Sequence, residues 1–272
     1  MSEIRLKGAS GLGDTIYAWP IVKWYAQKYD TVHYMTDYPE LYETLKNVIC
    51  YKHLKTNDLG GGPVDVRFTY CARKYTPGTS QFEDSVLSAK IHEKLKLKID
   101  WTIKNTDLVN NIISRSDEKK ICVLAYPYEP FGREDEWGSM LRINQEVMQI
   151  LIDRFKDRVF FIGTGNRFVL HKTNNVDMDL HEKTSVSDMM DLISICNLGL
   201  SQIGNMLPMC ESLGKKNFLI FANKAMVQTE NKFINAITPE KTVHYKHLNC
   251  SVHDEMSHEV ITNKFNDFIK EK

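Results

Sequence analysis

The sequence predicts an α/β protein built from two doubly wound, Rossmann-like domains that face each other across a cleft. Three observations support this fold class. The chain has 272 residues, more than one typical core needs. Short apolar stretches alternate with segments of helical periodicity. Glycines follow several of the predicted strands, where ligands of this fold class bind.

The first half opens with a βαβ unit. Ile4 and Leu6 alternate with charged residues in a short strand, a glycine-rich loop follows, and helical periodicity begins at Thr15, with Pro20 expected to kink the helix. Residues 31–35 predict a second strand, so the two strands should be parallel with a right-handed crossover. The later elements expected in this half are a loop over 57–63, a strand over 65–70 and a helix over 81–99.

The second half repeats the alternation of strands and helices after a polar run at 114–120. We therefore expect an N-terminal domain over 1–117, a second domain over 118–250, and a C-terminal segment, 251–272, whose helix packs back on the first domain. The expected strands of this half are 121–125, 159–162, 198–201 and 217–221, and the expected helices are 143–156, 186–195, 206–213 and 255–270.

The bulk composition excludes several classes of protein. Thirty-five Lys and Arg balance 35 Asp and Glu, so the chain lacks the strong positive field of a typical nucleic-acid binder. The six cysteines are scattered without a C-x-x-C pair, which argues against a disulfide framework and a zinc site. No stretch approaches the roughly 18 apolar residues of a membrane span, and no leader is evident. These features predict a cytoplasmic protein without a metal or cofactor.

The run from Gly8 to Thr15 has the spacing of a phosphate-binding P-loop, but Asp14 stands where that loop has its lysine. A carboxylate there would repel a nucleoside triphosphate. The dinucleotide fingerprint also fails, because its third glycine position is Ile16. Two interpretations of Asp14 remain: a helix cap worth about 1 kcal/mol, or a general base whose pKa is raised by burial.

A second motif lies between residues 201 and 215, directly after a predicted strand. Gly204 would form the tight turn, Pro208 suits a first helical turn, and Glu211 lies one turn into the helix. Helix N-terminal N–H groups bind phosphate, and a carboxylate accepts hydrogen bonds from ribose hydroxyls. The motif therefore suits a nucleoside diphosphate, although Glu211 is also compatible with a solvent-facing position on an ordinary helix.

These motifs resemble those of the heptosyltransferase-like enzymes of glycosyltransferase family 9, which have the GT-B fold. The likeness rests on Gly13-Asp14 followed by Pro20, on Trp137, and on the runs 162–165 and 211–215. It implies that Asp14 is the catalytic base and that Glu211 binds the donor ribose. It also implies that the first domain binds the acceptor and the second the nucleotide-sugar.

The chain departs from the family pattern at two places. It has no D-[ST]-G-x-x-H before the last helices, and Asp135 replaces the lysine of K-x-W. The resemblance therefore does not extend to an ADP-heptose donor. The expected donor contacts are Gly13, Arg133, Gly163, Gly165, Arg167, Gly204, Asn205, Met206 and Glu211, and the expected acceptor contacts are Gly11, Tyr70, Arg73 and Lys74. Both arginines are also compatible with ordinary surface positions.

The resulting hypothesis is an inverting, metal-independent glycosyltransferase that moves a sugar from a nucleotide-sugar to an acceptor hydroxyl. The acceptor would be a carbohydrate or, since the composition is compatible with a bacteriophage enzyme, hydroxymethylated DNA held by Lys90, Lys94, Lys96, Lys98 and Lys104. The alternatives are a non-catalytic nucleotide-binding module and a sugar-nucleotide epimerase. The D-x-D at Asp177 and Asp179 lies in a polar run rather than after a strand, and Cys210 has no evident histidine partner.

Overall fold

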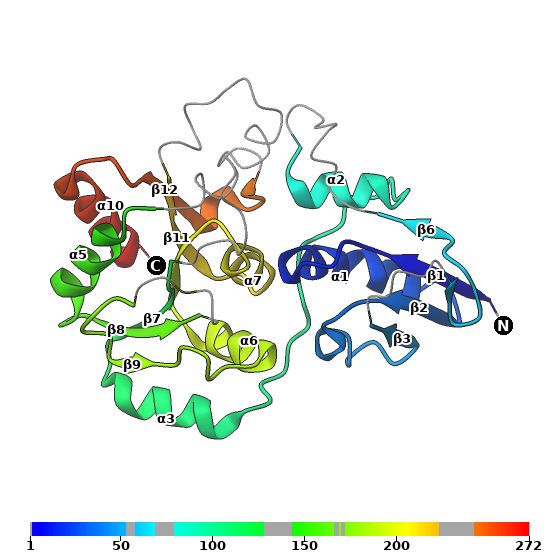
Figure 1. The fold of residues 1–272 in the computed structure, drawn as a ribbon, viewed down its shortest axis with the longest axis horizontal. Helices are drawn as coiled ribbons and strands as arrows, with labels where there is room; N and C mark the ends of the chain where they lie inside the picture. Colours follow the sequence, from blue (N-terminus) through cyan, green and yellow to red (C-terminus); the bar gives the residue numbers. More distant parts are fainter. Residues whose placement is uncertain are drawn as a thin grey trace. The chain divides into compact units, whose positions relative to one another are not determined.

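The computed structural model describes residues 2–52, 58–68, 79–127, 143–165, 169, 172–222 and 242–271. The chain divides into two compact units, each with its own parallel sheet (Figure 1). The first unit comprises Met1–Trp101 and Glu240–His244, and the second comprises Thr102–Pro239 and Tyr245–Lys272. Within the described ranges, no helix is long and apolar enough to cross a membrane.

The first unit has a four-stranded sheet in the order β3-β2-β1-β6, with every pair parallel. A short antiparallel hairpin, β4-β5, accompanies it. The strands are β1 (Glu3–Lys7), β2 (Thr31–Met35), β3 (Val48–Tyr51), β4 (Asp58–Leu59), β5 (Gly62–Pro63) and β6 (Val66–Arg67). The helices are α1 (Leu12–Ala26), η1 (Pro39–Leu41) and α2 (Gln81–Ser88).

Helix α1 forms the expected crossover between β1 and β2. Its 15 residues run on through Pro20, and its buried side chains include Ile16, Trp19 and Val22. The strand predicted over 65–70 is present as the shorter β6. The helix predicted over 81–99 ends at Ser88. Lys90 then adopts a left-handed conformation with φ of 59°, which a helix does not tolerate, and residues 91–100 form neither helix nor strand.

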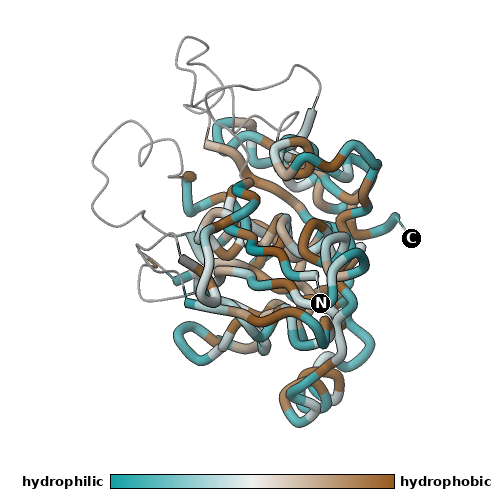
Figure 2. Tube along the Cα trace, turned by 90° about the vertical axis from the view of Figure 1, so that its right-hand side faces the viewer, coloured by the Kyte–Doolittle hydropathy of each residue, from teal (hydrophilic) through white to brown (hydrophobic). Residues whose placement is uncertain are grey.

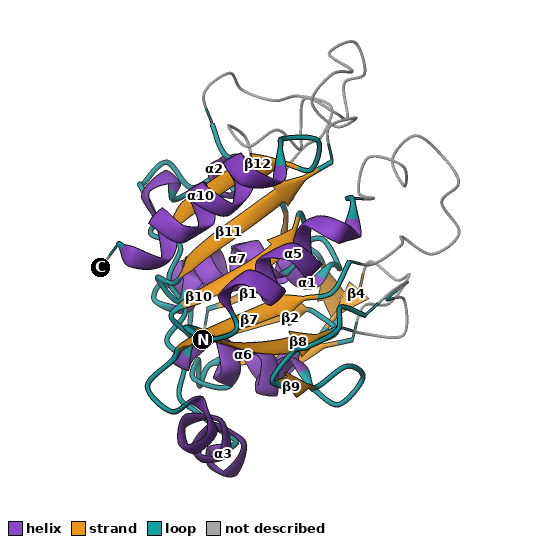
Figure 3. Cartoon of the chain, turned by 90° about the vertical axis from the view of Figure 1, so that its left-hand side faces the viewer, coloured by secondary structure: helices purple, strands orange, loops and turns teal. Residues whose placement is uncertain are grey.

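The second unit has a six-stranded sheet in the order β12-β11-β10-β7-β8-β9, again with every pair parallel (Figure 3). The strands are β7 (Lys120–Ala125), β8 (Val159–Thr164), β9 (Met178–Asp179), β10 (Leu198–Gln202), β11 (Lys216–Phe221) and β12 (Asn249–His253). The helices are α3 (Thr106–Ser116), α5 (Gln145–Phe155), α6 (Val186–Ile195), α7 (Met206–Ser212), η3 (Lys246–Leu248) and α10 (His258–Lys270).

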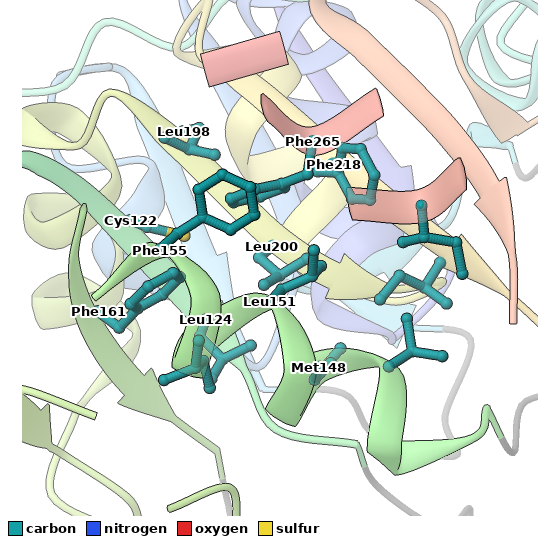
Figure 4. Close-up of a cluster of buried hydrophobic side chains, with 14 of the residues drawn as sticks. Cys122, Leu124, Met148, Leu151, Phe155, Phe161, Leu198, Leu200, Phe218 and Phe265 are labelled. Carbon is teal, nitrogen blue, oxygen red and sulfur yellow. The ribbon is translucent and has the colours of Figure 1, made fainter. Parts of the chain in front are cut away.

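Helices α5 and α10 cover one face of this sheet and form its main hydrophobic core (Figure 4). Phe265 of α10 is fully buried there, with its ring edge-on to Phe155 and Phe218 at centroid distances of 5.0 and 5.1 Å. Along the Cα trace, hydrophobic stretches alternate with hydrophilic ones (Figure 2). The C-terminal helix therefore packs on the sheet of the second unit and belongs to that unit.

The boundary between the units also differs from the predicted one at 117/118. The buried carboxylate of Asp191 in α6 accepts the backbone N–H groups of Lys104 and Asn105 at 3.1 and 2.7 Å. These bonds tie the start of α3 to α6, so α3 belongs to the second unit. The polar run at 114–120 is the exposed end of α3 and the turn before β7, rather than a linker.

Candidate functional site

The strand order of the first unit reverses between β1 and β6. In parallel α/β sheets, ligands bind beside the carboxyl ends of the two strands at such a reversal. The loop after β1 starts at Gly8 and leads into α1 with Asp14. The loop after β6 leads to Tyr70, Arg73 and Lys74, which lie outside the described residues. Two segments singled out in the sequence therefore leave neighbouring strands at the reversal.

Asp14 lies in the first turn of α1, three residues after the N-cap Gly11, and Gly13 is the second residue of the helix. The Asp14 carboxylate folds back and accepts the backbone N–H of Gly11. A Cβ at Gly11 would lie only 2.7 Å from Asp14 Oδ2, so this approach requires glycine. The carboxylate thus satisfies one of the helix's free N–H groups, which is half of a capping box.

Burial raises the pKa of Asp14 from its ordinary 3.8 to about 6, although the hydrogen bond from Gly11 acts in the opposite direction. The carboxylate is therefore ionised at neutral pH but far more basic than an exposed aspartate. Its side chain remains partly exposed. A general base works best when its pKa lies near the operating pH, so Asp14 combines the capping contact with the basicity that proton abstraction needs.

The glycine loop lies directly against two aromatic rings, those of Tyr34 and Phe68, which the sequence did not single out. A Cβ at Gly8 would lie 3.0 Å from the Tyr34 hydroxyl and 3.1 Å from the Phe68 ring. The rings of Tyr34 and Phe68 stack with an interplanar angle of 7° and centroids 6.2 Å apart. Gly8 therefore allows the backbone after β1 to approach these two rings. Only the tertiary structure reveals that this position requires a glycine.

In the second unit the strand order reverses between β7 and β10, which pair from Leu198 with Cys122 to Leu200 with Leu124. The loop after β7 leads to Arg133, which lies outside the described residues, as does Arg167. Gly204 and Asn205 follow β10 directly, and Asn205 is exposed. Met206 opens α7 with its side chain buried in the core, so only its backbone N–H is placed to make the predicted donor contact, which stays a prediction.

Glu211 is not the surface residue that an ordinary helix would give, because it is only 1% exposed. Its Oε1 accepts the backbone N–H of Tyr245 at 2.7 Å and the Asn249 Nδ2 at 3.0 Å. These bonds hold the segment that contains η3. The geometry favours this positioning role over direct contact with a ribose, a contact that requires an accessible carboxylate.

Gly163 and Gly165 each make room for a neighbouring side chain. A Cβ on Gly163 would lie 2.0 Å from the Tyr126 hydroxyl, and one on Gly165 would lie 2.5 Å from Val169 Cγ2. The Tyr126 hydroxyl in turn donates to Asp179 Oδ1 at 3.4 Å. Packing therefore explains both glycines without a bound donor.

The two D-x-D aspartates are engaged in contacts within the second unit, and that of Asp177 holds the start of β9 beside β8. Asp177 Oδ2 accepts the backbone N–H of Phe161 at 2.8 Å, and Asp179 Oδ2 pairs with Lys172 at 3.0 Å. Among the described residues, no group of three or more His, Cys, Asp and Glu side chains is arranged to hold a metal ion. Cys210 is fully buried, and burial raises the pKa of its thiol, as expected for a core cysteine.

No protein-family model and no curated protein sequence matches the chain. Several solved structures match it over nearly its whole length. A family 9 glycosyl transferase from Veillonella parvula aligns over 100% of this chain and 98% of its own, with a TM-score of 0.69 and 9% identity. The E. coli ADP-heptose LPS heptosyltransferase II aligns over 99% of both chains, with a TM-score of 0.66 and 10% identity. E. coli heptosyltransferase WaaC with ADP aligns over 98% and 97%, with a TM-score of 0.54 and 9% identity.

The likeness spans the whole chain and confirms the predicted fold class. This chain shares with these glycosyltransferases an architecture of two α/β units, each with a parallel sheet. Because only about one residue in ten is identical, the comparison establishes the fold and not the function.

Proposed function

We propose that this protein is a glycosyltransferase that moves a sugar from a nucleotide-sugar donor to an acceptor hydroxyl, with Asp14 as the general base. The observation that carries the proposal is a desolvated carboxylate, with a pKa of about 6, beside the strand reversal of the first unit. The solved structures that share the fold support it, since WaaC was determined with ADP and with ADP-2-deoxy-2-fluoro heptose.

In the proposed reaction the Asp14 carboxylate removes the proton from the acceptor hydroxyl as its oxygen attacks the anomeric carbon. The bond from that carbon to the diphosphate breaks, and the nucleoside diphosphate leaves with the electron pair, so the configuration inverts. Backbone N–H groups after β10, and Arg133 in the sequence that follows β7, would stabilise the leaving charge without a metal ion. The first unit would hold the acceptor and the second the donor, in the cytoplasm.

Replacing Asp14 with asparagine tests the base directly. The asparagine side chain keeps the shape and an oxygen that can accept the Gly11 N–H, but it cannot take a proton. We expect transfer to fall about 10²–10⁴-fold with donor affinity unchanged. Asp107→Asn is the matched control, because Asp107 also lies in the first turn of a helix, α3, and is exposed. Near wild-type transfer by Asp14→Asn would exclude the base assignment.

Product analysis separates transfer from the two other functions. A transferase releases the nucleoside diphosphate and places the sugar on the acceptor. An epimerase returns an isomerised nucleotide-sugar, and a non-catalytic binding module returns the donor unchanged. Incubation with a panel of nucleotide-sugars, chosen by the thermal stabilisation that each produces, followed by separation of the products, distinguishes all three outcomes.

DNA is the second candidate acceptor, because three lysines lie on one side of a segment that is not helical. Leu97 and Ile99 are buried while the alternating Lys94, Lys96 and Lys98 are exposed, so the three lysines share the exposed side of this segment. The acids of this segment, Glu93 and Asp100, pair with lysines of the α1 region. Within the described residues, no ion pair involves the members of this lysine face, Lys94, Lys96 and Lys98.

Salt dependence tests this candidate. If the lysine face contacts DNA phosphates, changing all three lysines to glutamine lowers the slope of log K against log salt by up to about 3, at ~0.9 per contact. The control is the same change at Lys46, Lys156 and Lys264, which are exposed elsewhere. No binding of duplex DNA at low salt would leave a carbohydrate as the acceptor.

A further inference from the structure

We propose that Tyr42 is a positioning residue for the catalytic carboxylate: it holds the first turn of α1, and with it Asp14, in the orientation that proton abstraction requires. This inference rests on the proposed function, since it assigns Tyr42 to the transfer reaction. Tyr42 does not touch the reacting atoms and acts through the α1 backbone.

The Tyr42 side chain is 2% exposed and follows η1 directly. Its hydroxyl donates a hydrogen bond of 2.7 Å to the backbone carbonyl of Thr15. Thr15 is the residue after Asp14, and its N–H bonds to the carbonyl of Gly11 to begin the helix. The buried Tyr42 hydroxyl is therefore bonded to the backbone carbonyl of the residue that follows the proposed base.

A second bond reinforces this contact one helical turn further along. The Trp19 Nε1 donates to the carbonyl of Leu41, the last residue of η1, at 2.9 Å. Residues 41 and 42 thus hold α1 at positions 15 and 19. Pro20 lacks the N–H that would otherwise bond to the carbonyl of Ile16, so α1 misses one of its own hydrogen bonds in this region. The hydrogen bonds from residues 41 and 42 therefore hold α1 in the region where the helix lacks one of its own backbone hydrogen bonds.

Orientation matters more for a base than for a side chain that only packs. Catalytic groups must be held within about 0.5 Å of the productive geometry, and a misplacement of about 1 Å can cost roughly 10²-fold in rate. Loosening the first turn would also let water reach the Asp14 carboxylate. Loss of the Tyr42 hydroxyl is therefore expected to change both the rate and the titration of Asp14, while the bound substrates keep their contacts.

The test compares Tyr42→Phe with Tyr25→Phe. Tyr25 lies in α1, and its buried hydroxyl also donates a hydrogen bond to a backbone carbonyl, that of Ala89, at 2.8 Å. It lies 11 residues beyond Asp14, about 16 Å along the helix axis. Each variant loses one buried tyrosine hydroxyl and keeps its ring. Tyr42→Phe also removes the hydrogen bond between the Tyr42 and Tyr34 side chains, so the comparison rests on kcat and on the titration of Asp14 rather than on thermal stability.

We expect Tyr42→Phe to lower kcat by about 10–100-fold with KM unchanged, and Tyr25→Phe to leave both near wild type. The carboxyl of Asp14, followed by NMR titration, should show a pKa that falls from about 6 toward 3.8 only in Tyr42→Phe. Equal kcat and equal titration in the two variants would overturn the inference. A wild-type protein that transfers no sugar refutes the proposed function instead, and the titration still decides whether Tyr42 positions Asp14.

Discussion

Asp14→Asn should make the folded protein more stable at neutral pH. The folded pKa of about 6 lies above the ordinary 3.8 of an unfolded aspartate, so the folded chain binds this proton more tightly. The stabilising contribution of the proton is complete below about pH 3.8 and is lost as the pH rises through 6. At about pH 7.5 the wild-type protein therefore carries a buried charge that asparagine does not have.

The gap between 3.8 and about 6 corresponds to about 3 kcal/mol at ~1.36 kcal/mol per pKa unit. Because the side chain is partly exposed, solvent screening reduces this, and we expect a gain of about 1–3 kcal/mol. At roughly 2–4 °C per kcal/mol, the melting temperature should rise by several degrees. The residue proposed as the base would thus lower stability, as is common for functional groups.

Thermal unfolding of the wild type and of Asp14→Asn, followed by circular dichroism from about pH 4 to pH 8, measures this difference. The gain should be full near pH 7.5 and should shrink steadily as the pH falls below about 6. Asp107→Asn should instead lose about 0.3–1 kcal/mol, because an exposed carboxylate in a first helical turn favours the helix. An Asp14→Asn protein that melts at or below the wild-type temperature near pH 7.5 would refute the desolvation argument.

Two further substitutions test how the second unit is held. Glu211→Ala removes the acceptor of the Tyr245 and Asn249 bonds, and should cost about 3 kcal/mol or more in calorimetric unfolding; an unchanged transition would exclude the positioning role. Gly163→Ala places a methyl group 2.0 Å from the Tyr126 hydroxyl and should lower the free energy of unfolding in urea by about 1–3 kcal/mol, whereas wild-type stability would mean that Tyr126 can move aside.

Local hydrophobic patterning was enough to place most elements. The prediction of a strand over 31–35 matches β2, and eight second-unit elements lie close to their expected ranges: β7, β8, β10, β11, α5, α6, α7 and α10. The pattern failed at 81–99, where the helix ends at Ser88 and the buried Ile91, Leu97 and Ile99 lie in a segment without helical structure after the left-handed Lys90. Among the elements that it missed are β3, β9, β12 and the helix α3. The three strands are placed by pairing with β2, β8 and β11, and the start of α3 by hydrogen bonds to Asp191 of α6, so their positions depend on other segments of the chain.

The sequence by itself determined that a carboxylate follows a glycine loop at the end of the first strand, since this depends only on neighbouring residues. The tertiary structure decided what that carboxylate can do. Its raised pKa comes from burial, and the helical turn that carries it is bonded by the Tyr42 hydroxyl, 28 positions further along the chain. Glu211, equally prominent in the sequence, is buried and accepts hydrogen bonds from Tyr245 and Asn249. Desolvation and hydrogen bonding depend on segments brought together only by folding, so no local pattern records them.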